Sequence, residues 1–170
     1  ARKIITELLL SNHPDDCLYC ERNGNCELQD LAAELNIRER RLTGRKSHAK
    51  LDLSSPGIVH DPAKCVLCGR CIRVCEDKIN ATTLELKGRG NNTIVSTPMN
   101  KGINFSSCVQ CGQCIMVCPT GALHDKSYFN VIQEAIGNKD EVTTTAFYSP
   151  SVLVSLAEEF GLRPGKQLTG

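Results

Sequence analysis

The chain has 170 residues, and its 20 lysines and arginines against 19 aspartates and glutamates give a formal net charge of +1. A balance this close to neutral gives no support for binding to nucleic acid or to an anionic membrane. Aromatic residues make up only 4% of the chain, tryptophan is absent, and there are eleven cysteines. A chain so poor in large apolar side chains can draw stability from bound metal instead.

The beginning of the sequence, Ala1 to Ile4, is not a secretory signal, and no apolar run reaches the roughly 18 residues that span a bilayer. The sequence therefore predicts a cytoplasmic protein. In that compartment, cysteine clusters indicate metal or redox chemistry more often than disulfides. The odd number of cysteines also fits badly with a closed disulfide framework.

Two helices are predicted in the first third of the chain. Residues 2–12 place apolar side chains at helical spacing, and the helix should end before Pro14, since the residue preceding a proline is pushed out of the α region. Residues 17–26 read as a tight loop, and residues 27–35 as a second helix. The apolar residues of the first helix are Ile4, Ile5, Leu8 and Leu9, and those of the second are Leu28, Leu31, Ala32 and Leu35.

Residues 38–50 are strongly basic, with six cations against Glu39 alone, and Gly44 should prevent a helix there. We interpret this segment as a solvated linker, with a docking patch for an acidic partner as the alternative. The cations are Arg38, Arg40, Arg41, Arg45, Lys46 and Lys50. Residues 54–57, Ser-Ser-Pro-Gly, mark a boundary between domains.

An internal repeat is the strongest signal in the sequence. Residues 65–75 read CVLCGRCIRVC and residues 108–118 read CVQCGQCIMVC. This spacing is that of the bacterial two-cluster ferredoxins, in which the fourth cysteine of each run binds the other [4Fe–4S] cluster. The predicted ligand sets are Cys65, Cys68, Cys71 and Cys118 for one cluster, and Cys75, Cys108, Cys111 and Cys114 for the other.

The repeat also predicts local structure. Gly69 and Gly112 should adopt a left-handed conformation where the loop wraps the cluster, and the fourth cysteine of each run should begin a helix. Between the runs we expect a short helix at 76–81 and strands near 83–87 and 93–96, joined by a turn at 88–92. Paired C-x2-C motifs also occur in zinc sites, but two runs of four cysteines fit zinc poorly. The sequence departs from the pattern at Glu76, where the second run has Pro119.

A third site is predicted ahead of the repeat. His13, Cys17, Cys20 and Cys26 are spaced as a Cys3His set, for which zinc remains an alternative. A histidine in place of one cysteine would leave an iron–sulfur cluster less negative, as the raised potentials of Rieske centres show. This set and the two above use every cysteine of the chain. The remaining histidines, His48, His60 and His124, are interpreted as ordinary surface or loop residues.

The end of the chain changes character. Residues 142–147 are rich in Thr and Val and predict a strand. Ser149 and Pro150 are suited to begin a helix over residues 152–160, which Gly161 should close. A strand that leads into a helix indicates the start of a further domain, which we expect to continue after residue 170.

These motifs resemble a known family. Residues 1–32 resemble the His/Cys3 cluster module of [FeFe] (iron-only) hydrogenases, of the large iron–sulfur subunit of respiratory NADH dehydrogenase and of some NAD-linked formate dehydrogenases. Residues 65–77 and 106–123 resemble the ferredoxin module that follows it in the hydrogenases and the formate dehydrogenases. Residues 148–170, YSPSVLVSLAEEFGLRPGKQLTG, resemble the opening of the [FeFe] hydrogenase catalytic domain, which favours the hydrogenases.

The resemblance implies an α+β fold: a small helical His/Cys3 module (1–55), a ferredoxin-like domain with two [4Fe–4S] clusters (56–130), and a linker with the start of an incomplete α/β catalytic domain (131–170). It implies an electron relay with three [4Fe–4S] clusters and no catalytic cluster of its own. It also implies a [2Fe–2S] domain ahead of residue 1 and a flavin- and NAD(P)H-binding iron–sulfur partner subunit, with soluble ferredoxin as a further partner in electron-bifurcating complexes.

Two other functions remain open at this point. The first is an iron–sulfur subunit of a different NAD-linked dehydrogenase, of the formate dehydrogenase, transhydrogenase or respiratory NADH dehydrogenase type. The second, from another class, is a structural zinc-binding module.

Overall fold

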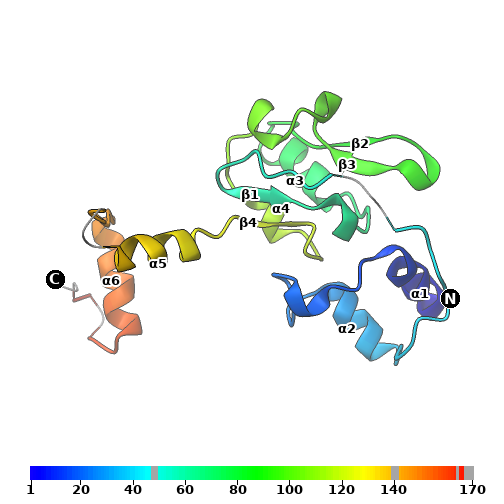
Figure 1. Cartoon of the computed structure of the whole chain (residues 1–170), viewed down its shortest axis with the longest axis horizontal. Helices are drawn as coiled ribbons and strands as arrows, with labels where there is room; N and C mark the ends of the chain where they lie inside the picture. The colour runs from blue at the N-terminus through cyan, green and yellow to red at the C-terminus, as the bar shows by residue number, and fades with distance from the viewer. Residues whose placement is uncertain (47–49, 139–141, 164, 167–170) are drawn as a thin grey trace. The chain divides into compact units, whose positions relative to one another are not determined.

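The computed structural model describes residues 1–46, 50–138, 142–163 and 165–166. The chain divides into two compact units, residues 1–127 and residues 128–170 (Figure 1). The first unit combines short helices with two small antiparallel sheets, so the α+β prediction is confirmed. Short 3-10 turns lie at Cys17–Tyr19, Pro62–Lys64, Gly90–Asn92, Pro98–Asn100 and Ile103–Phe105.

Two contacting helices form the beginning of the first unit, as predicted: α1 (Arg2–Asn12) and α2 (Glu27–Glu34). The apolar stripe of α1 lies on the outside, because Ile4 and Ile5 are each 57% exposed. The polar side chain of Glu7 is buried instead. The helix is therefore held by polar contacts of its inner face.

Those contacts come from the basic segment. Arg41 donates hydrogen bonds to both carboxylate oxygens of Glu7 at 2.7 Å. Arg40 forms an ion pair with Asp15 and donates to the His13 carbonyl at 3.1 Å. Residues 38–45 are exposed and form no helix or strand, as expected of a solvated linker, but the charges of Arg40 and Arg41 are paired within the unit, which was not predicted. His48 lies outside the described residues.

Two sheets of two strands each complete the first unit. Strand β1 (Ile58–His60) pairs antiparallel with β4 (Leu123–Asp125), with Val59 opposite His124. Strand β2 (Glu85–Lys87) pairs antiparallel with β3 (Ile94–Ser96), and the turn between them has positive φ angles at Gly88 and Gly90. The predicted hairpin is confirmed, whereas the pairing of β1 with β4 was not predicted.

The helices of the repeat begin earlier than expected. Helix α3 (Arg70–Asp77) follows directly on Gly69, and α4 (Gln113–Met116) on Gly112, and both glycines are left-handed as predicted, with φ of +70° and +71°. The predicted helix at 76–81 is wrong, because the glycine caps let the helices start inside the cysteine runs. Cys75 therefore lies near the end of a helix and Cys118 lies after one, so neither begins a helix.

The core of the unit is built around cysteine side chains. Buried apolar residues from the strands and loops surround Cys71 and Cys118, and Cys65, Cys108 and Cys114 pack against this cluster. The apolar members are Ile58, Leu84, Val95, Ile103, Ala122 and Leu123. Five of the eight repeat cysteines therefore belong to the core or pack against it, whereas Cys68 and Cys111 are exposed.

The second unit contains α5 (Phe129–Gly137), which was not predicted, and α6 (Pro150–Glu159). Ser149 caps α6 and Gly161 is left-handed at φ +76°, as the sequence predicts. Residues 142–149 form no strand, so that prediction is wrong: β-prone residues make a strand only where a partner strand pairs with them. None of the helices in the described residues is long and apolar enough to cross a membrane.

Candidate metal centres

The first site is a cavity of about 510 Å³ lined by His13, Cys17, Cys20 and Cys26. Local structure places each of them. His13 caps the end of α1 in an extended conformation, Cys17 opens a 3-10 turn that ends just before Cys20, and Cys26 caps the start of α2. The four side chains that sequence spacing grouped together therefore face one space.

The imidazole of His13 is oriented as a ligand would be. Its Nδ1 lies 3.1 Å from the Pro14 carbonyl oxygen, which can only accept, so Nδ1 carries the hydrogen. Nε2 is buried without a hydrogen-bond partner of ordinary geometry. Burial also lowers the pKa of His13, which favours the neutral ring. A buried imidazole nitrogen with no hydrogen-bond partner of ordinary geometry among the described residues fits a metal-binding role.

The second site groups Cys65, Cys68 and Cys71 with Cys118, which line one cavity. The loop between the first cysteines is tightly wound, since Leu67 has φ of +56°. This winding points the Leu67 amide at Cys65 Sγ, 3.4 Å away. Cys118 comes from the other end of the domain, so the group crosses between the two runs.

The third site is the reciprocal group: Cys75 joins Cys108, Cys111 and Cys114 around another cavity. Gln110 has φ of +57°, and its amide lies 3.4 Å from Cys108 Sγ, which repeats the geometry of the second site. The left-handed residues at these loop positions are not glycines, and nothing in their side chains indicated the conformation. The repeat itself was the signal, because equal loops must wind equally.

Burial keeps several of these thiols protonated. It raises the pKa of Cys65 and of Cys114 to about 11, and that of Cys71 to about 12. Buried thiols that ionise only when a metal displaces their protons are suited to soft metals and iron–sulfur clusters. Across the described part of the chain, no group of three or more His, Cys, Asp or Glu side chains is arranged to hold a single metal ion.

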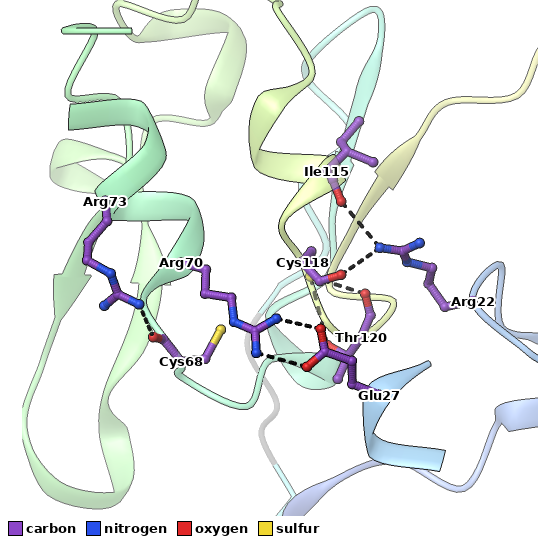
Figure 2. Close-up of polar contacts among 8 residues, drawn as sticks. All are labelled: Arg22, Glu27, Cys68, Arg70, Arg73, Ile115, Cys118 and Thr120. Atoms are coloured by element: carbon purple, nitrogen blue, oxygen red, sulfur yellow. Dashed lines mark hydrogen bonds and ion pairs between the residues drawn. The ribbon is translucent and has the colours of Figure 1, made fainter. Parts of the chain in front are cut away.

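The lining of the first cavity contacts the backbone of the second site (Figure 2). Arg22 lines the first cavity and donates to the carbonyl oxygens of Cys118 at 2.6 Å and Ile115 at 3.4 Å. Glu27, at the start of α2, binds Arg70 through both carboxylate oxygens, at 2.5 and 2.8 Å. The two modules are thus joined beside their ligands.

Sequence reasoning misjudged two histidines. His60 lies in β1, is only 3% exposed, and lines the second cavity, with its Nε2 buried and unpartnered among the described residues. His124 lies half-buried in β4 and donates from Nδ1 to the Gly121 carbonyl at 3.1 Å. Neither is a surface or loop residue. The signal for His60 was its place after Ile58 and Val59, an apolar run that indicates a buried strand.

Family models match both halves of the first unit. Residues 2–41 match the iron–sulfur binding region of NADH-ubiquinone oxidoreductase-G. Residues 64–122 match the 4Fe-4S dicluster domain. The first match covers His13, Cys17, Cys20 and Cys26, and the second covers the two cysteine runs. The chain therefore carries 4Fe-4S binding regions.

Relatives match over different lengths. The NADP-reducing hydrogenase subunit HndD of Solidesulfovibrio fructosivorans is 39% identical over 171 residues, 100% of this chain and 29% of that protein. The NADH-quinone oxidoreductase G-subunit of Escherichia coli (strain K12) is 36% identical over 99 residues, and the G-subunit 2 of Rhizobium meliloti (strain 1021) is 37% identical over 97 residues. Those matches cover 57% and 56% of this chain and 11% of each relative. The chain thus spans less than a third of these proteins.

A solved structure supports the same assignment. The NAD+-reducing [NiFe]-hydrogenase in the H2-reduced state contains a chain that superposes with a TM-score of 0.68 and 26% identity, over 72% of this chain and 53% of that one. We conclude that the chain is an iron–sulfur electron-transfer segment related to the hydrogenase subunit HndD and to the G-subunit of NADH-quinone oxidoreductase.

Proposed function

We propose that this chain is the relay arm of an [FeFe]-hydrogenase-type subunit and holds three [4Fe–4S] clusters. The observation that carries the proposal is the grouping of all eleven cysteines and His13 into three sets of four around three cavities. The sets are His13 with Cys17, Cys20 and Cys26, then Cys65 with Cys68, Cys71 and Cys118, and last Cys75 with Cys108, Cys111 and Cys114.

Different residues of the chain have different roles in such a relay. When bound, the clusters supply one-electron carriers whose potentials respond to their ligands and surroundings. The thiols hold them inside the apolar core, and the fixed tautomer of His13 presents Nε2. Arg22 lies against both the first cavity and the backbone of Cys118, so the first site adjoins the second. Cys71 and Cys75 lie one turn apart on α3, so the second site adjoins the third.

The setting follows from the relatives. HndD, by its name an NADP-reducing hydrogenase subunit, matches the whole chain, whereas the NADH-quinone oxidoreductase subunits match little more than half. This difference favours the hydrogenase over a respiratory dehydrogenase. We infer a cytoplasmic complex with a flavin- and NAD(P)H-binding iron–sulfur subunit. We also infer a [2Fe–2S] domain and a hydrogen-activating domain elsewhere in the longer protein. Within this chain, we propose module limits of 1–55, 56–130 and 131–170.

Anaerobic reconstitution of the chain with iron and sulfide tests the cluster content. We expect about twelve iron atoms per chain, roughly four per site. His13→Ala should remove or alter only the first cluster, and His124→Ala, a variant outside all three sets, should load as the wild type does. Stoichiometric zinc with little iron after anaerobic purification would instead support the structural zinc module.

In the assembled complex, His13→Ala should slow reduction of the other two clusters by reduced nicotinamide nucleotide. Stopped-flow absorbance and electron paramagnetic resonance (EPR) measure this directly. Unchanged transfer rates after demonstrated loss of the first cluster would show that this cluster lies off the path.

A further inference from the structure

The two cysteine runs are nearly identical in sequence but differ in charge. Three of their eleven positions differ, and two of these exchange an arginine for a neutral residue: Arg70 corresponds to Gln113, and Arg73 corresponds to Met116. In both runs these positions lie beside the third cysteine and within the helix that follows the left-handed glycine. The loops of the two runs therefore wind in the same way, but the residues that follow them differ in charge.

The two arginines of the first run, Arg70 and Arg73, lie beside Cys68 of the second site (Figure 2). Arg73 donates to the Cys68 carbonyl at 3.3 Å. The pKa of Arg70 is raised, first by its pairing with Glu27 and also by the charges of Cys68 and Cys118. Arg22, from the first module, adds a third cation at the carbonyl of Cys118.

The third site lacks this arrangement. The two sites differ in the arginines just outside the cavities and not in the linings: neither the second cavity nor the third has an arginine, lysine or carboxylate among its lining residues. Most of the lining of the third cavity is aliphatic: Ile58, Val74, Ile79, Leu84, Ile103 and Val109. The helix face that carries Arg73 in the second site carries Met116 here.

Hydrogen bonds from backbone amides to cysteine sulfur atoms also stabilise a reduced cluster, but they do not favour the second site over the third. The Leu67 amide bonds Cys65 Sγ and the Gln110 amide bonds Cys108 Sγ, both at 3.4 Å. The third site has one more, from Thr83 to Cys75 Sγ at 3.4 Å, which favours reduction there. A full positive charge acts over a longer range than one amide dipole, so Arg22 and Arg73, with Arg70 partly neutralised by Glu27, outweigh it.

We propose that Arg22, Arg70 and Arg73 raise the reduction potential of the cluster held by Cys65, Cys68, Cys71 and Cys118 above that of its repeat counterpart. Reduction adds a negative charge to a cluster, and nearby cations stabilise that charge. An electron shared between the repeat-related clusters then resides mainly on the one that adjoins the first module. This inference rests on the proposed function, since it requires loaded sites. The three arginines act through their charge and are not ligands.

The test is an EPR-monitored redox titration of the reconstituted full chain. The double variant Arg70→Gln, Arg73→Met turns the first run into its counterpart at both charged positions. We expect the ratio of reduced to oxidised second cluster at a fixed potential to fall about tenfold, equivalent to about 59 mV for a one-electron couple. The third cluster should be unaffected. Cys68→Ser and Cys111→Ser, each of which removes one cluster, assign the two signals.

Further variants test the sign of the effect on the reduction potential. Glu27→Gln removes the anion that pairs with Arg70 and should raise the potential of the second cluster. Gln113→Arg with Met116→Arg adds cations to the third site and should raise the potential there alone. Arg22→Gln should lower the second potential, and Arg22→Lys, which keeps the charge, should restore it.

The salt dependence separates charge from structure. The Arg70 side chain is 43% exposed, so the shift caused by Arg70→Gln should shrink as ionic strength rises. Potentials that stay unchanged in all these variants, with both clusters loaded, would overturn the inference and leave the proposed function standing. Failure of the wild-type chain to load would refute the proposed function itself. If Arg22 variants do not load, the gain-of-charge variant at Gln113 and Met116 decides the question.

Discussion

A methyl group on Gly121 would lie 2.5 Å from the Sγ atom of Cys20. Real Cβ atoms do not approach sulfur so closely, so the ferredoxin-like region comes into contact with a ligand of the first site at this glycine. We expect Gly121→Ala to displace Cys20 and to remove about four of the roughly twelve iron atoms, with the signal of the first cluster lost. Iron analysis and EPR of the reconstituted chain measure this.

Gly57→Ala is the matched control, because the nearest atom to its added carbon is Gln110 Oε1 at 3.8 Å, an ordinary contact. It should load all three sites. A Gly121→Ala chain that retains the first cluster would show that Cys20 is not held where the structure places it, or is not a ligand.

Crossed ligation gives a second prediction. Cys118 follows the second run in sequence but lines the cavity of Cys65, Cys68 and Cys71. Cys118→Ser should therefore damage the cluster of the first run and spare the cluster that contains Cys111. Combining it with Cys68→Ser should cause little additional loss, whereas combining it with Cys111→Ser should remove both clusters. A single loss in the Cys118–Cys111 combination would contradict the crossed arrangement.

Asp52 joins the start of the ferredoxin-like region to its middle. Its carboxylate accepts from the amides of Ser54 at 2.9 Å and Ile103 at 2.8 Å, and Ile103 is almost fully buried. Asp52→Ala leaves these donors without their acceptor and should lower the free energy of unfolding by about 1–3 kcal/mol. Asp125→Ala, at an exposed strand end, should change it little. Urea unfolding of the loaded chain measures both.

The pH dependence of that contribution follows from the pKa of Asp52. Burial alone would raise this pKa, but the hydrogen bonds from Ser54 and Ile103 hold it below its ordinary value of 3.8. A depressed carboxyl pKa stabilises the fold fully above the unfolded value and loses that effect as pH falls through the folded value. The difference between wild type and Asp52→Ala should therefore shrink below about pH 4. A constant difference across that range would exclude a role for the charge.

Cluster removal should take up protons. Burial raises the pKa values of Cys65 and Cys114 to about 11 and of Cys71 to about 12, so these three thiolates gain protons when their metal leaves at neutral pH. Extraction by an iron chelator should be more favourable at about pH 6.5 than at about pH 8.5. A pH indicator in weakly buffered solution detects the uptake. The released sulfide also takes up protons, and its share is subtracted from the total. Extraction without any remaining uptake would indicate that these thiols are not the ligands.

Much of this arrangement could be read from the sequence because it is local or repeated. Cysteine spacing predicted the three groups of ligand candidates, and Gly69 and Gly112 predicted the left-handed turns that wind the loops. Helices α1, α2 and α6 followed from apolar spacing and from their end signals. In each case the information lies within a few residues along the chain.

The errors arose where distant residues decide the structure. Strand β1 pairs with β4, more than sixty residues away in sequence. Strands of three residues have too short a hydrophobic pattern to predict such a pairing. The ion pairing of the basic segment was missed because Glu7, which binds Arg41, lies in another element. The strand predicted at 142–147 had the right residues and no partner strand.

The pairing of β1 with β4 also bears on how such modules are combined within one polypeptide chain. The amide of Lys126 bonds the carbonyl of Gly57 at 3.1 Å, so the chain leaves the two-cluster region at the point where it entered. A segment whose ends meet can be inserted into a host chain, or deleted from it, with little disturbance at the junction. Residues 57–126 therefore have the form of a cassette, a unit that gene fusion can add to or take from different oxidoreductases as a whole.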